Sequence, residues 1–185
     1  MNTDLARPFL RVLTRCYRRP QMLMRNIASL CDQTCEDWEQ TLLVDTQGIG
    51  VGAAQRVLAE HGRYIQGEYV WVLDDDDECT RPTLVEELKG IVSVHDADVV
   101  MVRMAREGVV LPEDKYWGVP PVLGHVTCSA PIVRRALWQA CSDAWGESYS
   151  GDYDFIAALF DGNPGVYWHD CVASATQRIS HGEPE

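Results

Sequence analysis

Strand-like and helix-like segments alternate over the first hundred residues of this 185-residue chain. Short apolar runs predict the strands, and apolar residues at helical spacing predict the helices between them. Strands that are joined by helices pair in parallel, and the helices then cover both faces of the sheet. The chain is therefore predicted to be an α/β protein with a mostly parallel central sheet. The strand patterns cover residues 9–15, 38–45, 69–74 and 98–105, and the helical patterns cover residues 20–33, 52–62 and 82–94.

The pattern changes in the second half of the sequence. Residues 105–130 are rich in glycine, proline and aromatic residues, which predicts loops over the sheet. Two helical patterns follow over residues 131–145 and 151–160, and a last strand pattern covers residues 165–174. No repeat, low-complexity tract or linker divides the chain, so a single domain over residues 1–185 is predicted.

Composition narrows the class of partners. The formal net charge is −12, which argues against a nucleic-acid surface because phosphate groups attract basic proteins. No apolar stretch is long enough to cross a membrane, and the first residues are too polar for a signal peptide. Seven cysteines without the spacing of a disulfide framework or a zinc motif predict free thiols in a reducing compartment. We therefore expect a cytoplasmic protein with no transmembrane segment and no nucleic-acid partner.

An unbroken run of four aspartates, residues 74–77, directly follows the apolar strand pattern YVWVL. If the chain stays extended there, Asp74 and Asp76 project to one side, about 6.5 Å apart. Two such charges repel by about 2.6 kcal/mol at an effective dielectric constant of about 20, and a bound divalent cation relieves that repulsion. Carboxylate oxygens suit Mg²⁺, Mn²⁺ or Ca²⁺. The alternative is a solvated acidic turn that binds nothing.

Four segments in order resemble the nucleotide-binding half of a family 2 glycosyltransferase with the GT-A fold. They are VLTRCYRRP at the end of the first strand, SLCDQTCEDWE at the end of the first helix, LLVD at the end of the second strand, and the D-x-D motif in VLDDDDE at the end of the third. The segments GDYDF and QRISHG extend the resemblance toward the C-terminus. The resemblance implies a Rossmann-like GT-A sandwich, in which about residues 1–104 bind the nucleotide sugar and about residues 105–185 form the acceptor and catalytic half.

The resemblance implies roles for residues at the ends of the first two strands. Thr14 and Tyr17 match positions that cradle the nucleotide base, and Arg15 and Arg18 lie beside them in the sequence. Asp45 matches the carboxylate that accepts a hydrogen bond from the base or the ribose. An aspartate at a strand end also commonly caps the following turn, so a structural role for Asp45 stays open.

The resemblance also implies a divalent metal cofactor, Mn²⁺ or Mg²⁺, at the run of aspartates. Asp74 and Asp76 match the D-x-D pair, with Asp74 and Asp75 toward the donor and Asp76, together with Asp74, at the metal. His181 matches a C-terminal histidine that reaches the metal in some members of the family, and His169 is the alternative.

The segment GDYDF matches the signature that contains the catalytic base, which assigns this role to Asp152. Gly151 replaces the glutamate that usually precedes this aspartate. Asp154 is the alternative base, in which case Asp152 caps the helix. Trp117 and Tyr149 are candidates for stacking on a sugar ring of the acceptor, and Asp154 is a further candidate for the acceptor site.

These roles together predict a metal-dependent glycosyltransferase that moves a sugar from a nucleoside-diphosphate sugar to an acceptor, with inversion at the sugar carbon. The chemistry needs a cation site for the departing diphosphate and a separate carboxylate that deprotonates the acceptor hydroxyl, and the sequence offers both. The acceptor can be a glycan, a lipid-linked sugar or a protein. The alternative is a catalytically inactive nucleotide-sugar or carbohydrate-binding module on the same fold.

Overall fold

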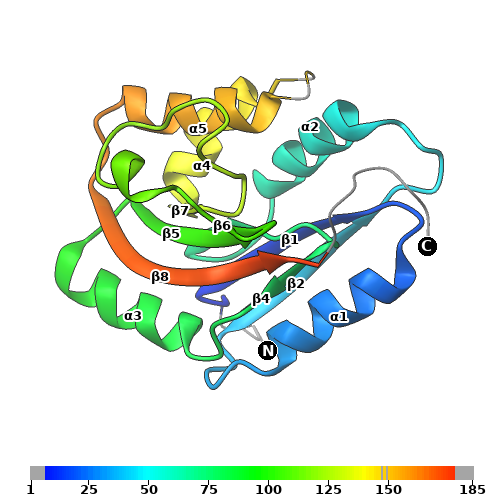
Figure 1. Ribbon diagram of the computed structural model, residues 1–185, viewed down its shortest axis with the longest axis horizontal. Coiled ribbons are helices and arrows are strands. Elements are labelled where there is room, and N and C mark those ends of the chain that lie inside the picture. Colours follow the sequence, from blue (N-terminus) through cyan, green and yellow to red (C-terminus); the bar gives the residue numbers. More distant parts are fainter. Residues whose placement is uncertain (1–6, 147, 149, 178–185) are drawn as a thin grey trace, which may run out of the picture.

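The computed structural model describes residues 7–146, 148 and 150–177, in which helices cover both faces of one curved sheet (Figure 1). The helices are α1 (Pro20–Cys31), α2 (Val51–Gly62), α3 (Leu84–His95), α4 (Arg135–Cys141) and α5 (Gly151–Asp161), with short 3₁₀ turns η1 (Asp114–Tyr116) and η2 (Ser142–Ala144). The strands are β1 (Leu10–Cys16), β2 (Trp38–Val44), β3 (Tyr69–Val72), β4 (Asp77–Cys79), β5 (Val99–Arg106), β6 (Val109–Leu111), β7 (Pro131–Arg134) and β8 (Val166–Thr176).

The described strands form an eight-stranded sheet in the order β2-β1-β3-β7-β5-β8-β4, and β6 pairs with β5. Strands β2, β1, β3, β5 and β8 run in one direction, because each is linked to the others by parallel pairing or across the antiparallel β7. Strands β4, β6 and β7 run the opposite way. The predicted α/β fold with a mostly parallel sheet is confirmed.

Each face of the sheet has its own apolar core, because successive side chains of a strand point to opposite faces. Helices α1 and α3 cover one face, where Leu30 and Leu88 pack with Trp71. Helices α2, α4 and α5 cover the other, where the rings of Trp138 and Phe155 pack in a tilted arrangement with their centroids 4.7 Å apart. None of the described helices is long and apolar enough to cross a membrane.

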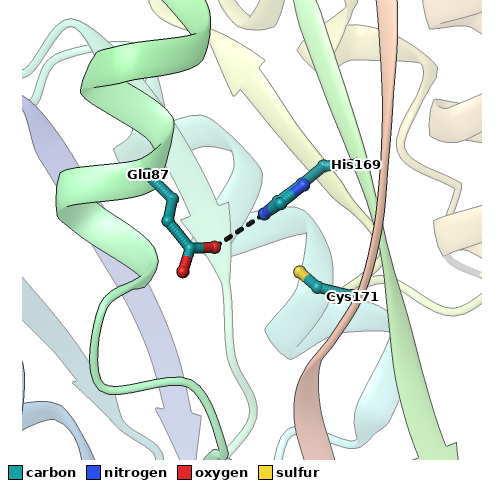
Figure 2. A group of neighbouring side chains, drawn as sticks. All are labelled: Glu87, His169 and Cys171. Carbon is teal, nitrogen blue, oxygen red and sulfur yellow. Dashed lines mark hydrogen bonds and ion pairs between the residues drawn. The ribbon is translucent and has the colours of Figure 1, made fainter.

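Helix α3 is joined to β8 by polar contacts at the rim of the first core. The Nε2 atom of His169 on β8 lies 2.7 Å from a carboxylate oxygen of Glu87 on α3 (Figure 2). The side chain of His169 therefore points toward α3.

The prediction of one helix over residues 131–145 is wrong at its start. Residues 131–134 form β7, which pairs antiparallel with both β3 and β5, and the helix begins only at Arg135. Ile132 and Val133 are fully buried between those strands, so β-branched side chains fill the centre of the sheet. The three-residue strands β4 and β6 were also not predicted, because so short a segment carries no periodicity.

Candidate functional site

A cavity of about 660 Å³ lies beyond the carboxyl ends of β1, β2 and β3. Open parallel sheets bind their ligands at this edge. One wall comes from the chain after β1, the turn after β2 and Asp74, Asp76 and Asp77. We call residues 74–77 the acidic quartet. The facing wall comes from β5, β6, residues 123–128 and the first turn of α5. Segments from both halves of the chain therefore meet around one cavity.

The acidic quartet is a tight turn. The backbone N–H of Asp77 donates to the carbonyl of Asp74 at 2.9 Å, and β4 starts at Asp77. The side-chain amide of Asn26 on α1 donates to the carbonyls of both Asp74 and Asp77, at 2.9 Å each. The expectation of an extended chain through Asp74 and Asp76 is therefore wrong, because these tertiary hydrogen bonds hold the backbone in a turn. The side chains of Asp74 and Asp76 nevertheless both line the cavity.

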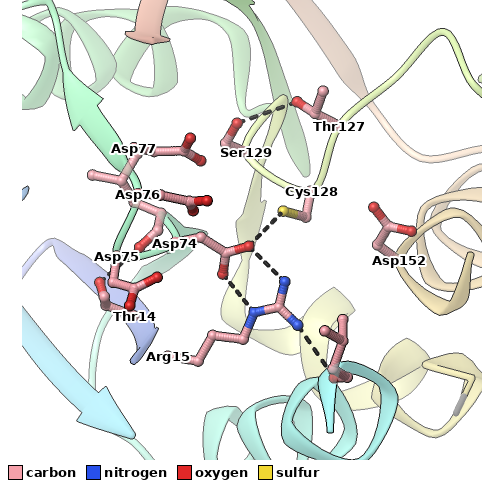
Figure 3. Close-up of polar contacts among 12 residues, drawn as sticks. Thr14, Arg15, Asp74, Asp75, Asp76, Asp77, Thr127, Cys128, Ser129 and Asp152 are labelled. Carbon is pink, nitrogen blue, oxygen red and sulfur yellow. Dashed lines mark hydrogen bonds and ion pairs between the residues drawn. The ribbon is translucent and has the colours of Figure 1, made fainter. Parts of the chain in front are cut away.

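Arg15 holds Asp74 in a two-point ion pair. Its Nε and Nη2 atoms donate to the two carboxylate oxygens at 2.9 and 2.7 Å, and Nη1 donates to the carbonyl of Val51 at 3.2 Å (Figure 3). This is a bidentate pair, in which two N–H groups of one guanidinium donate to the two oxygens of one carboxylate. Arg15 and Asp74 thus fix the end of β3 relative to the start of α2.

Arg19 holds the next two aspartates. Its Nη2 atom lies 2.5 Å from Oδ1 of Asp75, and its Nη1 atom lies 2.7 Å from Oδ2 of Asp76. Asp75 is fully buried and does not line the cavity, in contrast to the predicted donor contact. Burial raises the pKa of the Asp75 carboxyl to about 6, although the attraction of Arg19 opposes the shift. Asp75 therefore anchors Arg19, and Asp76 presents its carboxylate to the cavity.

Asp77, at the start of β4, has a nearly fully buried carboxyl group. It is 4% exposed, and the Thr176 hydroxyl donates to its Oδ1 atom at 3.0 Å. Burial raises the pKa of Asp77 well above its ordinary value, and the like charges of Asp74 and Asp76 raise it further. Without a cation nearby, this carboxyl holds a proton more readily than a solvated aspartate does.

Asp152 lies across the cavity in the first turn of α5. Figure 3 shows its carboxylate facing Cys128 and the pair formed by Arg15 and Asp74. Burial raises the pKa of Asp152, and the charge of Asp74 adds to this rise, while a hydrogen bond from the backbone of Tyr153 opposes it. The alternative in which Asp152 serves as the helix cap does not match the structure, because Ser150 occupies the N-cap position.

Asp45 belongs to the turn after β2 and also lines the cavity. Its carboxylate accepts hydrogen bonds from the backbone N–H groups of Gln47, Gly48 and Ile49, at 2.9, 2.7 and 2.8 Å. Burial acts to raise the pKa of Asp45, but these three donors outweigh it and the pKa is lowered. Asp45 therefore caps the turn after β2, which is the structural role that the sequence left open. Because Asp45 also lines the cavity, it can contact a ligand as well.

Tyr17 and Arg18 form the outer wall on the same side. Tyr17 is 38% exposed, and the guanidinium carbon of Arg18 lies 5.1 Å from the centre of its ring. The hydroxyl of Tyr17 passes so close to Gly48 that a Cβ atom there would lie 2.6 Å from it. Gly48 also has a positive φ of 73°, which favours glycine. An aromatic face and an exposed cation thus flank Asp45.

Thr14 lies outside the cavity. It is fully buried, and its hydroxyl donates to the carbonyl of Leu73 at 2.8 Å and accepts from the side chain of Gln40 at 2.8 Å. The same Gln40 amide donates to the side chain of Asn26 at 2.7 Å. The predicted direct contact of Thr14 with the base does not fit this placement, because its hydroxyl supports the turn of the acidic quartet from below.

The wall formed by the second half is largely apolar. Met104, Leu111, Leu123 and Val126 line it, and Leu123 is 58% exposed. Cys128 lies between this wall and the quartet, with its sulfur 3.8 Å from Oδ2 of Asp74. Burial and the charge of Asp74 raise the pKa of Cys128 well above its ordinary value, so the thiol stays neutral.

Three further candidates do not reach the cavity. Trp117 packs edge-on against Trp168, with ring centroids 5.0 Å apart, and Arg103 lies 4.2 Å from its ring centre. Asp154 is exposed beside Gly146 and lies outside the cavity wall. His169 contacts Glu87 on the far face of the sheet. These placements favour Asp152 over Asp154 as the carboxylate of the site and remove His169 from it.

Tyr149 and His181 lie outside the described residues. Their predicted roles at the acceptor and at the metal stay predictions.

The sequence interpretation missed several supporting residues. It assigned no specific role to Arg19, Asn26, Cys128 or Thr176. Arg19 lies between the end of β1 and the first residue of α1, Pro20. This position, at the sheet edge where parallel strands end, could have indicated that Arg19 lies near the aspartates. The contacts of Asn26 and Thr176 depend on long-range packing and left no signal in the sequence.

The residues of the quartet fit a divalent cation. Asp76 and Asp77 offer hard carboxylate oxygens to the cavity, as Mg²⁺ and Mn²⁺ require. Burial raises the pKa of Asp77, and the like charges of its neighbours add to the rise, because two guanidinium groups balance only part of the charge of four carboxyl groups. A cation at Asp76 would share that carboxylate with Arg19.

No family model and no curated protein sequence matches this chain. Its fold matches solved structures of S. aureus TarS. Against TarS 1-349, the TM-score is 0.68 at 17% identity over 91% of this chain and 60% of that one. Against TarS 1-349 in complex with UDP, it is 0.69 at 16% identity over 91% and 60%. Against the complex with UDP-GlcNAc, it is 0.71 at 16% identity over 95% and 60%.

Likeness at this level of identity shows the fold and confirms the predicted GT-A architecture. The chain spans about 60% of the length of these TarS 1-349 structures.

Proposed function

We propose that this chain is a metal-dependent glycosyltransferase that transfers a sugar from a nucleoside-diphosphate sugar to an acceptor, with inversion at the sugar carbon. One observation carries the proposal. Asp152 lines the same cavity as Asp74 and Asp76, from the opposite wall, and its pKa is raised. A cation site and a separate base on two sides of one cavity are what displacement of a diphosphate by a hydroxyl requires.

The first wall suits the nucleotide part of the donor. The exposed ring of Tyr17 offers a stacking surface for a base, and Asp45 lies at the same wall. Arg18 is exposed there and can pair with a phosphate oxygen. The match to TarS structures that contain UDP and UDP-GlcNAc supports UDP-GlcNAc as the first donor to test.

A divalent cation bound by Asp76 and Asp77 would stabilise negative charge on the departing diphosphate. The chain itself supplies the orientation of these ligands. Arg15 fixes Asp74, and Arg19 fixes Asp75 and Asp76, so the quartet keeps its turn geometry when the donor arrives. Preorganised charges of this kind lower the barrier because they need no rearrangement during the reaction.

Asp152 acts as the general base. It takes the proton of the acceptor hydroxyl while the hydroxyl oxygen forms a bond to the anomeric carbon. The bond between that carbon and the diphosphate oxygen breaks on the opposite side, and its electron pair leaves with the nucleoside diphosphate. The raised pKa of Asp152 makes its carboxylate a stronger base than a solvated aspartate.

The apolar wall faces the acceptor side. Leu111, Leu123 and Val126 line the cavity next to the first turn of α5. Such a surface contacts the carbon-rich face of a glycan or the apolar part of a lipid-linked or protein acceptor. The acceptor class is therefore to be found by assay.

Thermal unfolding with a panel of nucleoside diphosphates and UDP-GlcNAc, with and without Mn²⁺, tests donor binding. We expect at least one nucleotide to raise the melting temperature in Mn²⁺, and EDTA to remove the effect, because a ligand that binds the native state stabilises it by mass action. An equal response with and without metal would contradict the metal dependence.

Release of UDP from UDP-GlcNAc, first to water and then in the presence of glycan acceptors, tests turnover. We expect slow hydrolysis that rises when a suitable acceptor is added. Nucleotide binding without release of UDP under any of these conditions would instead support the binding module.

A further inference from the structure

A second cluster of metal-ligand side chains lies on the face of the sheet opposite the cavity. Glu87 comes from the first turns of α3, and His169 and Cys171 come from β8 (Figure 2). His169 and Cys171 are two residues apart on a strand, so both side chains point to the same face, toward α3. The sequence interpretation assigned no role to Glu87 or Cys171.

The three possible ligand atoms, one oxygen, one nitrogen and one sulfur, all lie within 4.8 Å of one another. A tetrahedral Zn²⁺ with bonds of about 2.0 to 2.3 Å separates its ligand atoms by roughly 3.3 to 3.8 Å. The sulfur therefore needs to approach by at most about 1 Å, and the contact of 2.7 Å between Glu87 and His169 widens to admit the ion. Changes of this size need only small side-chain rotations.

The carboxylate of Glu87 is already oriented for such a role. Thr83 donates to its Oε1 atom at 2.5 Å, and the Nη2 atom of Arg81 lies 2.8 Å from the same oxygen. The Oε2 atom faces His169. Metal-binding carboxylates are commonly held in this way by hydrogen bonds to the oxygen that does not bind the metal. Burial acts to raise the pKa of Glu87, but the hydrogen bonds from Arg81, Thr83 and His169 lower it to about 2.

We propose that Glu87, His169 and Cys171 form a site for Zn²⁺, with water as the fourth ligand, which joins α3 to β8. One thiolate, one imidazole and one carboxylate form a ligand set that suits Zn²⁺ and disfavours Mg²⁺. The site differs in chemistry from the all-oxygen quartet, and it does not depend on the proposed transfer reaction.

The site is accessible without unfolding. The side chains of Glu87 and His169 are 23% and 21% exposed, and that of Arg81 is 44% exposed. Arg81 also contacts Oε2 through its Nε atom, at 3.0 Å. Its exposed side chain can give up this contact and keep the one to Oε1 when the metal binds. Cys171 is 8% exposed and lies at the inner end of the cluster, where burial raises the pKa of its thiol to about 11, so the thiol loses its proton only when the metal binds.

Titration of the metal-free protein with Co²⁺ tests the site, because Co²⁺ replaces Zn²⁺ and reports its ligands by absorption. We expect one equivalent of Co²⁺ to produce a thiolate-to-cobalt charge-transfer band together with visible bands of four-coordinate geometry, and Zn²⁺ to displace both. We expect Cys171→Ser to lose the charge-transfer band. Glu87→Gln, which keeps the thiol, should weaken Co²⁺ binding by at least about tenfold, the size of effect that even outer partners of metal ligands produce.

Matched controls separate this cluster from the cavity. Cys128→Ser removes the thiol beside Asp74, and Cys31→Ser removes an exposed thiol. Both variants, and Asp76→Ala, should keep the band. A protein that gives no band, or a band that persists in Cys171→Ser or disappears in Cys128→Ser, would overturn the proposal. In the first case, Glu87 and His169 form an ion pair only.

Discussion

The turn after β2 and the acidic quartet after β3 both present carboxylates to the same cavity, but their charges have different surroundings. Asp45 accepts three backbone hydrogen bonds from its own turn, and its pKa is lowered. In the quartet, burial raises the pKa of Asp75 to about 6 and that of Asp77 well above its ordinary value, although Arg19 contacts Asp75.

The difference shows which carboxylates need a ligand. The charge of Asp45 is stabilised within the protein, so its turn is complete without a partner. The quartet keeps an excess of negative charge in a buried place, and this costs stability unless a cation enters. Asp152 resembles the quartet in this respect, because its pKa is also raised. The four predictions below test this contrast.

The largest effect is expected on turnover, from replacement of Asp152 on the wall that faces the quartet. Asp152→Asn removes the proposed base and should reduce release of UDP from UDP-GlcNAc by a factor of about 10² to 10⁴. The thermal shift by nucleotide and Mn²⁺ should stay as in the wild type. Because the base must be ionised and its pKa is raised, wild-type turnover should fall as the pH is lowered through that pKa.

Asp154→Asn is the matched control for this prediction, since Asp154 lies two residues away and is exposed. Turnover should be unchanged in that variant. Full turnover in Asp152→Asn would place the base elsewhere.

The second effect concerns the ion pairs that partly balance the quartet. Arg19→Gln leaves the buried Asp75 without its partner and should lower the free energy of unfolding by about 3 kcal/mol. It should also tighten binding of Mn²⁺, because Asp76 loses a competing cation. Urea unfolding and calorimetry measure the two results.

Arg18→Gln tests whether any nearby arginine has this effect. Arg18 is exposed, so its replacement should change the free energy of unfolding by less than about 0.5 kcal/mol. Equal destabilisation by both variants would show that Arg19 has no special contact with the quartet.

The third effect is a pH dependence of stability. The pKa of Asp75 is about 6 in the folded protein, against an ordinary value of 3.8 in the unfolded chain, so the unfolded chain loses this proton first as the pH rises. Stability should therefore fall between about pH 4 and pH 6 and change no further above that range, by roughly 2 to 3 kcal/mol for this group. Asp45, with a lowered pKa, contributes in the opposite sense and loses its contribution only as the pH falls below 3.8.

Urea unfolding of the metal-free protein at pH 4.5 and pH 7, in the wild type and in Asp75→Asn, measures this slope. The variant should show a flatter dependence than the wild type. The same slope in both proteins would mean that Asp75 is not the group that titrates.

The smallest effect is expected in the turn after β2. The Cβ atom that Gly48→Ala adds would lie 2.6 Å from the Tyr17 hydroxyl, so Tyr17 has to move. The substitution should therefore weaken nucleotide binding a few-fold. Gly50→Ala is the matched control, because Gly50 also has a positive φ, of 89°, but no atom within 4 Å of the added Cβ. Both should cost about 1 kcal/mol of stability through backbone strain, and only the first should affect binding. Equal affinity in both variants would remove Tyr17 from the nucleotide site.

Most of the fold could be predicted because its first half follows local patterns. The apolar runs that become β1, β3 and β5 are buried on both faces, so each stands out as a short hydrophobic segment. Strand β7 could not be separated from the helix after it, because Pro131 to Arg134 continue into α4 without a break in the sequence. Its place between β3 and β5 is set by long-range pairing.

The site could be predicted only in outline. The ends of parallel strands locate Asp45, Asp74 and Asp76 at one edge of the sheet. The turn of the quartet depends on Asn26, which lies 48 residues from Asp74 in the sequence, and no local pattern indicates it. The position of His169 on the far face depends on the register of β8, which no part of the sequence fixes by itself.

Binding of Mn²⁺ to the metal-free protein, measured by calorimetry for the wild type, Asp76→Asn and Asp45→Asn, tests most directly whether the quartet is a cation site. We predict that one Mn²⁺ binds to the wild type and to Asp45→Asn with similar affinity, and that Asp76→Asn weakens binding by at least about tenfold. Equal affinity for all three proteins, or no binding to the wild type even with UDP present, would contradict the claim that the quartet is a cation site.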